Sequence, residues 1–368
     1  MKRLLLIGGG HAHVHVLAAL ADAPFADTEV TLLSPYPRQI YSGMLPGWVA
    51  GHYGIDDCAI PIDRLAQRAG VNFVQTACCS IDLAARVAHG TRGEQVAFDL
   101  LSIDSGPTVA ADHLPGAQQY AIPIRPIEGF VAAWPGLLAR ARQCEKTFNL
   151  AIVGDGAAGT ELAFAIQARF ASERLPLARV TLIGANDMPL GGFPVRLRRA
   201  VCKRLFQQGV TYLPNCRASA FFPGKLRLAN EALLDADASL LVTGAAAPGW
   251  PAASGLATDK GGFIRVTAGL QSISHPFVFA AGDIAAYAEP RPKSGVFAVR
   301  AGPILASNLR AAGQGQPLKD WAPQAQALYL ISTGQRYALA ARGSLSIGGR
   351  WVWRWKNWID RRFMRRFS

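Results

Sequence analysis

Residues 150–161 read Leu-Ala-Ile-Val-Gly154-Asp-Gly156-Ala-Ala-Gly159-Thr-Glu161, an apolar run that turns through three glycines into the start of a helix. Glycines at these positions are typical of a strand–turn–helix unit that binds a dinucleotide. The first glycine allows the tight turn, the second lets the backbone approach the pyrophosphate, and the third lets helix and strand pack closely. The helix start then presents its N–H groups to the phosphates.

A second copy of this pattern lies at the N-terminus. Residues 3–13 read Arg-Leu-Leu-Leu-Ile-Gly8-Gly-Gly10-His11-Ala-His13. Gly8 and Gly10 hold the first two positions, whereas His13 replaces the third glycine and would separate the helix slightly from the strand. His11 and His13 are candidates for contacts near a phosphate. Two copies, with Gly8 and Gly154 146 positions apart, are far more specific than either alone and predict an α/β chain with two dinucleotide-binding, Rossmann-like domains.

The acidic residue that usually binds the ribose is missing from both units. It is expected about 20 residues on, at the end of the second strand. Here the candidate second strands end in Ser34 and Gly184. Ser34 offers one weaker hydrogen bond. At the second unit the missing carboxylate removes the repulsion against a 2′-phosphate, but Asp187 is nearby. The donor therefore stays open between NADH and NADPH.

Composition sets the remaining limits. The chain has 368 residues, half of them hydrophobic and 17% charged, which favours two or three domains and excludes general disorder. It carries 38 Lys+Arg against 25 Asp+Glu, a net charge of +13, which leaves nucleic acid, an anionic membrane and anionic cofactors as partners. The six cysteines are dispersed, with no CxxC and no zinc spacing, which indicates a reducing cytoplasm. No apolar window is long enough for a spanning helix.

Much of this charge lies in the C-terminal tail. Residues 350–368 carry seven Lys/Arg, one acid and four of the eight tryptophans. Aromatic and apolar residues recur at helical spacing and predict one broad aromatic face: Trp351, Trp355, Trp358, Ile359, Phe363 and Phe367. Arg354, Lys356, Asn357, Arg361 and Arg365 are expected largely off that face. A basic helix rich in tryptophan is typical of an in-plane membrane anchor, although docking on the body or on a second copy stays open.

The chain resembles the pyridine nucleotide-disulfide oxidoreductase superfamily over nearly its whole length. The closest likeness is the FAD-dependent module found fused ahead of selenide, water dikinase, and the chain is also similar to type II NADH dehydrogenases. The stretches that carry the resemblance are Gly8–His13, Tyr41–Gly47, Leu101–Gly106, Gly282-Asp283, Lys293–Arg300 and Trp355–Met364.

The resemblance implies a domain plan and an activity. Residues 1–108 and 255–312 would form an FAD-binding domain, and 109–254 an NAD(P)H-binding-like domain inserted in it. Residues 313–368 would form a C-terminal segment for membrane association or dimerisation, ending in a basic amphipathic helix. The expected activity is hydride transfer from NADH or NADPH to FAD, with electrons then passed to a quinone or similar acceptor. The expected location is the cytoplasm, on the inner face of the cell membrane, through residues 350–367.

The resemblance also implies the site residues. Asp283 of the Gly282-Asp283 pair would hold a ribityl hydroxyl of FAD, and the turn at Ser42 and Gly43 would form a wall near the flavin. Glu161 would face the nicotinamide, while Lys293 and Arg300 would stabilise negative charge on the reduced flavin. The candidate cofactor-binding residues are Gly8, Gly10, His11, His13, Ser34, Arg38, Ser42, Gly43, Gly106, Gly282, Asp283, Gly154, Gly156 and Gly159, and the candidate catalytic residues are Glu161, Lys293 and Arg300.

Several features set limits on this assignment. The region that would hold a redox disulfide, residues 41–54, contains no cysteine, and none follows Asp283. A thiol relay is therefore disfavoured. The alternation of His11, His13 and His15 does not predict a metal site, because helical residues two apart do not face each other.

The alternative function is a flavoprotein of selenium or sulfur metabolism that acts on a soluble chalcogen compound. Nucleic acid is not an expected partner, because no nucleic-acid-binding module is recognisable.

Overall fold

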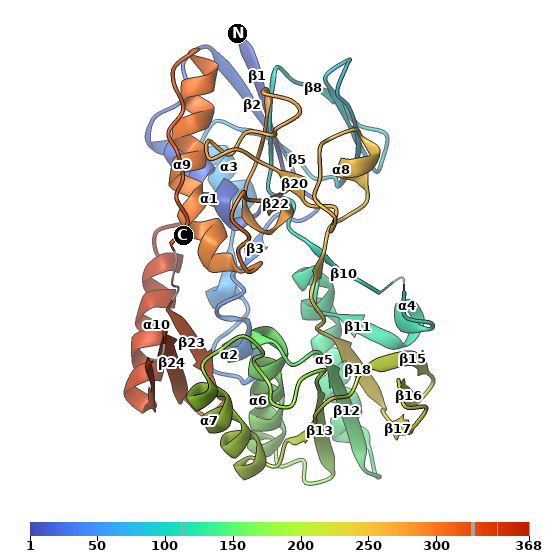
Figure 1. Ribbon diagram of the computed structural model, residues 1–368. Helices are drawn as coiled ribbons and strands as arrows, with labels where there is room; N and C mark the ends of the chain where they lie inside the picture. The colour runs from blue at the N-terminus through green and yellow to red at the C-terminus, as the bar shows by residue number, and fades with distance from the viewer. Residues whose placement is uncertain (112, 325–327, 344, 368) are drawn as a thin grey trace.

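The computed structural model describes residues 1–111, 113–324, 328–343 and 345–367. Two parallel sheets, each flanked by helices, lie one above the other in Figure 1, and the C-terminal segment runs along one side of the lower sheet toward the upper one. The arrangement confirms the predicted fold class.

The first sheet is built from the N-terminal unit. Its five strands are all parallel and run in the order β21-β9-β1-β2-β5. Leu4–Leu6 are buried on both faces of β1, which is why the strand reads as a continuous apolar run. The bounds are β1 Lys2–Ile7, β2 Thr28–Leu33, β5 Asn72–Val74, β9 Leu100–Ile103 and β21 Val278–Ala280, with helices α1 His11–Asp22, α3 Ile62–Arg68 and α9 Gly295–Gly313.

The second sheet repeats the order of four strands of the first, but its remaining edge strand comes before the glycine-bearing strand in the chain instead of after it. Its five parallel strands run in the order β11-β18-β12-β13-β14, so the glycine-bearing strand is central in both. The bounds are β11 Ala121–Pro123, β12 Phe148–Val153, β13 Ala178–Ile183, β14 Thr211–Leu213 and β18 Ala238–Leu241, with helices α5 Ile127–Gln143, α6 Ala157–Ser172 and α7 Val195–Gln207.

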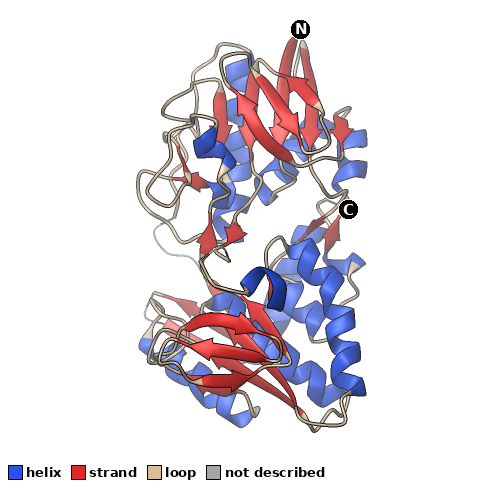
Figure 2. Cartoon of the chain, turned by 90° about the vertical axis from the view of Figure 1, so that its right-hand side faces the viewer, coloured by secondary structure: helices blue, strands red, loops and turns tan. Residues whose placement is uncertain are grey.

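Each unit also contains a three-stranded antiparallel sheet, which precedes β9 in the first unit and β18 in the second (Figure 2). These sheets comprise β6 Cys78–Asp82, β7 Val87–Gly90 and β8 Gln95–Ala97 in the first unit, and β15 Ala218–Phe222, β16 Lys225–Leu228 and β17 Leu233–Asp235 in the second. The chain leaves the first unit through β10 (Thr108–Val109) and returns through β19 (Ala245–Ala246), which pair antiparallel. The second sheet is therefore inserted between β9 and β21 of the first. The domain boundaries at 108, 254 and 312 stay a prediction.

Short elements complete the two units. β3 and β4 pair antiparallel, and α2, which follows β3, packs against α6 of the second unit. The bounds are β3 Gln39–Ile40, α2 Leu45–Val49, η1 Asp56–Cys58, β4 Ala59–Ile60, α4 Ala117–Tyr120, α8 Trp250–Ala253, β20 Ile264–Arg265, η2 Gly282–Ile284 and β22 Ala285–Ala286.

The C-terminal segment forms a small sheet and a helix. β23 (Tyr329–Ser332), β24 (Ala338–Arg342) and β25 (Leu345–Gly349) are antiparallel, and α10 (Arg350–Met364) packs on them. Residues 325–327, 344 and 368 of the predicted C-terminal segment 313–368 lie outside the described residues.

The single aromatic face predicted for the tail is wrong. Phe367 is 1% exposed and Phe363 is half-buried against the body, whereas three tryptophans, Trp351, Trp355 and Trp358, are exposed. Lys356, expected off the aromatic face, is buried together with Asp360. Residues four apart share one side of a helix, and the side that packs inward is the one carrying this charged pair.

Candidate active site

The first glycine turn has the geometry that a dinucleotide needs. Gly8 follows β1 with φ +92°, and a Cβ there would lie 2.4 Å from Ser105 Cα and 2.5 Å from Asp104 O. Only glycine fits this conformation and this space. Gly10 is the N-terminal cap of α1, so the turn delivers the chain directly into a helix N-terminus, where anions bind.

Asp104, at the end of β9, is a site residue that the sequence did not predict. Its Oδ2 accepts hydrogen bonds from the backbone N–H groups of Ala12 (2.7 Å) and His13 (3.0 Å). A Cβ on Gly10 would lie 2.3 Å from its Cγ, and one on Gly282 would lie 2.4 Å from its Oδ1. Burial raises the pKa of Asp104 to about 8. Burial thus favours the protonated carboxyl, which repels a phosphate at this helix start less than a carboxylate does.

The two predicted histidines take other positions. Both ring nitrogens of His13 are engaged, with Gly8 O at 2.6 Å and Ser102 Oγ at 2.8 Å, and the side chain is fully buried. His13 thus supports the turn from beneath rather than pointing to a phosphate. The His11 ring lies beside Tyr41 and Phe363. Burial lowers the pKa of both rings to about 4, so both are neutral.

Asp283 and Lys293 lie together, but Arg300 does not join them. Asp283 Oδ2 lies 3.4 Å from Arg125 Nη2. Burial raises the pKa of Asp283, and Arg125 and Lys293 oppose this shift. The Lys293 ammonium donates to Ala285 O (2.6 Å) and lies over the Phe263 ring. Arg300 is exposed on α9, and its side chain makes no hydrogen bond or ion pair with any residue that the structure describes.

The remaining candidates of the first unit are placed as follows. Ser34 is buried beside the turn, since a Cβ on Gly9 would lie 3.3 Å from its Oγ. Arg38 forms a two-point ion pair with Glu128. Ser42 Oγ would lie 3.3 Å from a Cβ on Gly295, which places this turn against the start of α9. Gly106 has φ +73° and open space around it.

The second turn satisfies the glycine requirement at two of its three positions. Gly154 has φ +120°, and a Cβ there would lie 2.3 Å from Val242 O. A Cβ on Gly159 would lie 1.9 Å from Gly154 O, so helix α6 packs tightly on the turn. Gly156 caps α6 and has open space around it. Thr243 Oγ1, just after β18, is buried and has no hydrogen-bond partner among the residues that the structure describes. An orphaned hydroxyl at the carboxyl edge of the sheet fits a site that receives a polar ligand.

Glu161 belongs to a charged cluster that joins α6, the turn at Gly43 and α10. Its Oε1 accepts the N–H of Ser332 (2.7 Å). Lys356 Nζ donates to Gly43 O (2.6 Å) and Asp360 Oδ2 (2.7 Å). Burial raises the pKa of Glu161 to about 7, and the Lys356 ammonium opposes this shift. Burial also raises the pKa of Asp360, to which Tyr41 donates a hydrogen bond.

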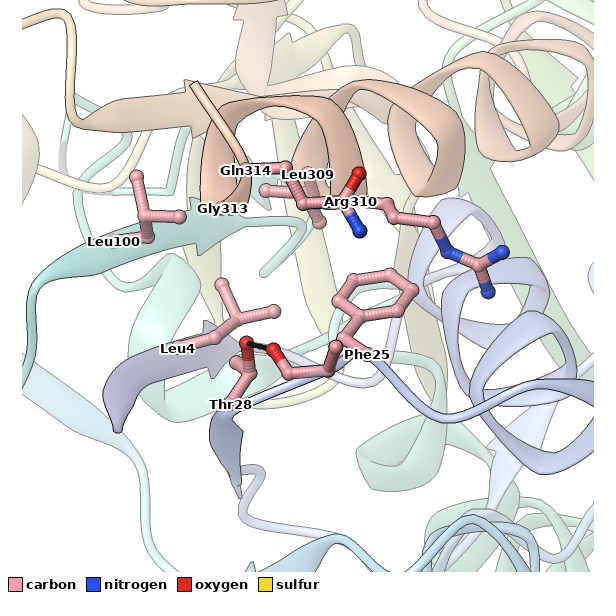
Figure 3. Close-up of a pocket in the computed structure, with 9 residues that line it drawn as sticks. Leu4, Phe25, Thr28, Leu100, Leu309, Arg310, Gly313 and Gln314 are labelled. Carbon is pink, nitrogen blue, oxygen red and sulfur yellow. Dashed lines mark hydrogen bonds between the residues drawn. The ribbon is translucent and has the colours of Figure 1, made fainter. Parts of the chain in front are cut away.

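The pocket in Figure 3 is not the active site. Leu4, Thr28 and Leu100 line it from the amino-terminal parts of three parallel strands, and Arg310 lies over Phe25 at its side. Ligands of open parallel sheets bind at the carboxyl ends of the strands, where Gly8 and Gly154 lie.

Comparison with known proteins assigns the chain to a family. Residues 2–302 match the family model described as pyridine nucleotide-disulphide oxidoreductase. The chain belongs to this family, and it is an FAD-dependent NAD(P)H oxidoreductase.

Curated relatives and solved structures agree. An NADH dehydrogenase-like protein of Mycobacterium tuberculosis (strain H37Rv) is 27% identical over 295 residues, 78% of this chain and 73% of the relative. Demethylphylloquinone reductase NdbB of Synechocystis is 26% identical over 170 residues, 44% of this chain and 42% of the relative. NDH2 of Plasmodium falciparum in complex with NADH has a TM-score of 0.83 at 13% identity, covering 99% of this chain and 98% of its own.

A further solved structure, the sulfide:quinone oxidoreductase of Aquifex aeolicus, has a TM-score of 0.82 at 17% identity and covers 100% of this chain and 91% of its own. Despite the family's name, all six cysteines of this chain are free thiols. Burial raises the pKa of Cys58 and that of Cys78 to about 12, so both stay protonated and unreactive at neutral pH.

Proposed function

We propose that this protein oxidises NADH or NADPH through bound FAD and passes the electrons to a quinone at the surface of a membrane. The main support for the proposal is the pair of glycine turns, because each turn places a helix N-terminus at the carboxyl edge of a parallel sheet. The first position of each turn must be glycine, since a Cβ there would collide with backbone atoms. The names of the relatives, NADH dehydrogenase-like protein and demethylphylloquinone reductase, support the donor and the class of acceptor.

The residues present fit FAD at the first turn. Gly8 and Gly10 open the space for the pyrophosphate, and the buried Asp283 carboxylate is available for a hydroxyl of the ribityl chain. When bound, FAD supplies the redox chemistry: it takes up a hydride and releases electrons to an acceptor. The protein needs no thiol for this transfer, which agrees with its six free cysteines.

The chain's own residues then handle charge and protons. Glu161, with a pKa of about 7, can hold or release a proton near neutral pH, as reduction of a quinone requires. Lys293, beside Asp283 and the start of α9, supports negative charge at that end of the site, together with the helix N-terminus. Arg300, exposed on α9, has no assigned part.

An anaerobic flavin titration tests the proposal. We expect the purified protein to carry FAD, NADH or NADPH to bleach the flavin absorbance, and a soluble quinone to restore it. A colourless protein that does not bind added FAD would contradict the assignment, as would a flavin that neither nucleotide reduces. Reduction by a soluble selenium or sulfur compound, with no response to either nucleotide, would establish the alternative function instead.

We further propose that the exposed side of the C-terminal segment binds an anionic membrane from the cytoplasmic side. Trp351, Trp355 and Trp358 are 55%, 38% and 51% exposed, and Leu345 and Ile347 of β25 are exposed at 75% and 51%. The exposed basic residues of α10 are Arg350, Arg354, Arg361 and Arg362. Tryptophan and arginine together favour the headgroup region of anionic lipids. Among the described residues no helix is long and apolar enough to cross a bilayer.

Replacing Trp351, Trp355 and Trp358 together by serine is expected to weaken binding to anionic vesicles strongly. The three indoles supply most of the apolar area that α10 exposes, so we expect an affinity at least about tenfold weaker. Vesicle flotation measures it, and flavin content confirms folding. Phe222→Ser, another exposed aromatic residue (41%), is the control and should float like the wild type. A triple variant that still floats would rule out this surface as the anchor.

A further inference from the structure

The end of β13, where a dinucleotide unit normally carries its ribose-binding carboxylate, has Gly184 instead. The structure nevertheless has a carboxylate there. It belongs to Asp155, the residue between the first two glycines of the second turn. A Cβ on Gly184 would lie 2.2 Å from Asp155 Oδ2 and 2.5 Å from Asp155 Cγ. The Asp155 side chain therefore occupies the space that a side chain at position 184 would need. An aspartate at 155 and a residue with a side chain at 184 cannot both fit.

The carboxylate of Asp155 is held in place by two neighbours. Tyr212, in β14, donates from its hydroxyl to Oδ2 at 2.9 Å. Asn186, just after β13, places its Nδ2 3.2 Å from Oδ1 and 3.1 Å from Oδ2. Asp155 as a whole is 8% exposed. A carboxylate has about four acceptor positions, so these contacts leave room for one further hydroxyl donor.

Arg198, a basic side chain near this edge, is directed elsewhere. Arg198, in α7, donates to Asp187 Oδ1 at 2.6 Å, to Met188 O at 2.8 Å and to Pro189 O at 3.2 Å. Its side chain is only 14% exposed. A 2′-phosphate would therefore meet the fixed Asp155 carboxylate, while this arginine is committed to other acceptors.

We propose that Asp155 replaces the missing strand-end carboxylate, binds the ribose hydroxyls of the adenosine half of NADH, and rejects NADPH. The inference rests on the proposed function, since it assigns the donor to the second glycine turn. A hydroxyl of the ribose donates to the carboxylate, whereas a 2′-phosphate places like charges together in a partly desolvated site. Asp155 is thus a specificity-determining residue that the pattern of the strand end alone would miss.

The test compares both nucleotides on the flavin-loaded protein and its Asp155→Asn variant. In single-turnover experiments the wild type should reduce its flavin more efficiently with NADH than with NADPH. In D155N the ratio of the two efficiencies should be smaller by about tenfold or more, a difference of about 1.4 kcal/mol. Calorimetric binding of NAD⁺ and NADP⁺ gives the same ratio without hydride transfer. Asp235→Asn is the control, because Asp235 is an exposed carboxylate of the same unit that pairs only weakly with Lys225, at 3.4 Å, and it should leave the ratio unchanged.

A second variant tests whether the carboxylate itself, and not a structural change at position 155, sets the nucleotide preference. Asp155→Gly combined with Gly184→Asp moves the carboxylate to the strand end and should restore the preference for NADH that D155N loses. FAD content and the thermal midpoint report folding. A wild type without preference, an unchanged ratio in D155N, or a shift in D235N of the size expected for D155N would each overturn the inference. Binding of NAD⁺ without flavin reduction would instead overturn only the proposed function.

Discussion

Gly8→Ala is expected to yield a protein that no longer retains FAD. A Cβ at this position would meet Ser105 Cα at 2.4 Å and Asp104 O at 2.5 Å. These are backbone atoms of the segment that follows β9, which pairs with β1 from Leu4↔Leu100 to Ile7↔Ile103. Neither strand can yield without breaking the sheet. The φ of +92° adds a strain of about 1–3 kcal/mol for any residue with a side chain.

The alanine therefore displaces the turn itself, and with it the N–H groups that would contact the pyrophosphate. We expect less than about a tenth of the wild-type flavin per protein, because a shift of this kind removes several contacts at once. Flavin absorbance after purification and after FAD is added back measures the loss. Nucleotide binding at the second turn should persist, since that turn belongs to the other sheet.

Gly93→Ala provides the matched control. Gly93 has φ +90°, nearly the same as Gly8, but nothing lies within 4 Å of the position a Cβ would take. Gly93→Ala introduces the strain of a positive φ but no steric clash of the new Cβ. It should therefore lose about 1 kcal/mol of stability and keep its flavin. Equal flavin content in G8A and the wild type would show that the turn is not the FAD site.

The two sheets were predictable because their signal is local. Gly8 and Gly154 each follow an apolar strand and precede a helix, and both prove to have positive φ beside a neighbouring strand end. The spacing of the two copies indicated the repeat, and the structure extends it to the order of four strands in each sheet.

The two carboxylates at the turns were not predictable in the same way. Asp104 reaches the N–H of Ala12 across 92 positions, a contact that exists only because β9 pairs with β1. Asp155 is adjacent to its glycine in sequence, yet its role depends on Gly184, Asn186 and Tyr212, which the folded sheet brings to it. Residue type and spacing along one strand cannot indicate such long-range pairs.

The tail shows a different limit. The helix was predicted correctly from its period. A hydrophobic stripe does not determine which side of a helix packs inward, however, when a charged pair such as Lys356 and Asp360 finds partners in the interior. Lys356 is buried because Gly43 O, Asp360 and Glu161 together receive its charge. The tryptophans are left outside, where solvent, a lipid surface or a partner meets them.

Lys356→Met is expected to destabilise the protein by about 3–5 kcal/mol, the usual result of removing one partner of a buried ion pair. Burial lowers the pKa of Lys356, but Asp360 and Glu161 outweigh this effect and raise it overall, so the ammonium is charged in the fold. Without it, two largely buried carboxyl groups lose their cation, and α10 loses its hydrogen bond to Gly43. Urea unfolding at a fixed excess of FAD measures the free energy of unfolding.

Two variants serve as controls. Arg354→Met removes an exposed charge from the same helix and should change stability by no more than about 0.5 kcal/mol. Lys356→Met combined with Asp360→Leu replaces the ion pair by apolar side chains, an exchange that is often neutral, and should recover most of the loss. If K356M unfolds at the urea concentration of the wild type, the cluster does not hold α10 to the body.

The pH dependence identifies the cause of the loss. Glu161 and Asp360 both have pKa values above those of the unfolded chain, and removing the Lys356 ammonium raises them further. A carboxyl with a raised folded pKa destabilises the fold fully above that pKa and not at all below its unfolded value. The loss in free energy of unfolding caused by K356M should therefore be largest near pH 8. It should shrink as the pH falls toward about 5, because Glu161 and Asp360 take up protons in the folded protein over that range. Lost packing alone would give a deficit that does not change with pH.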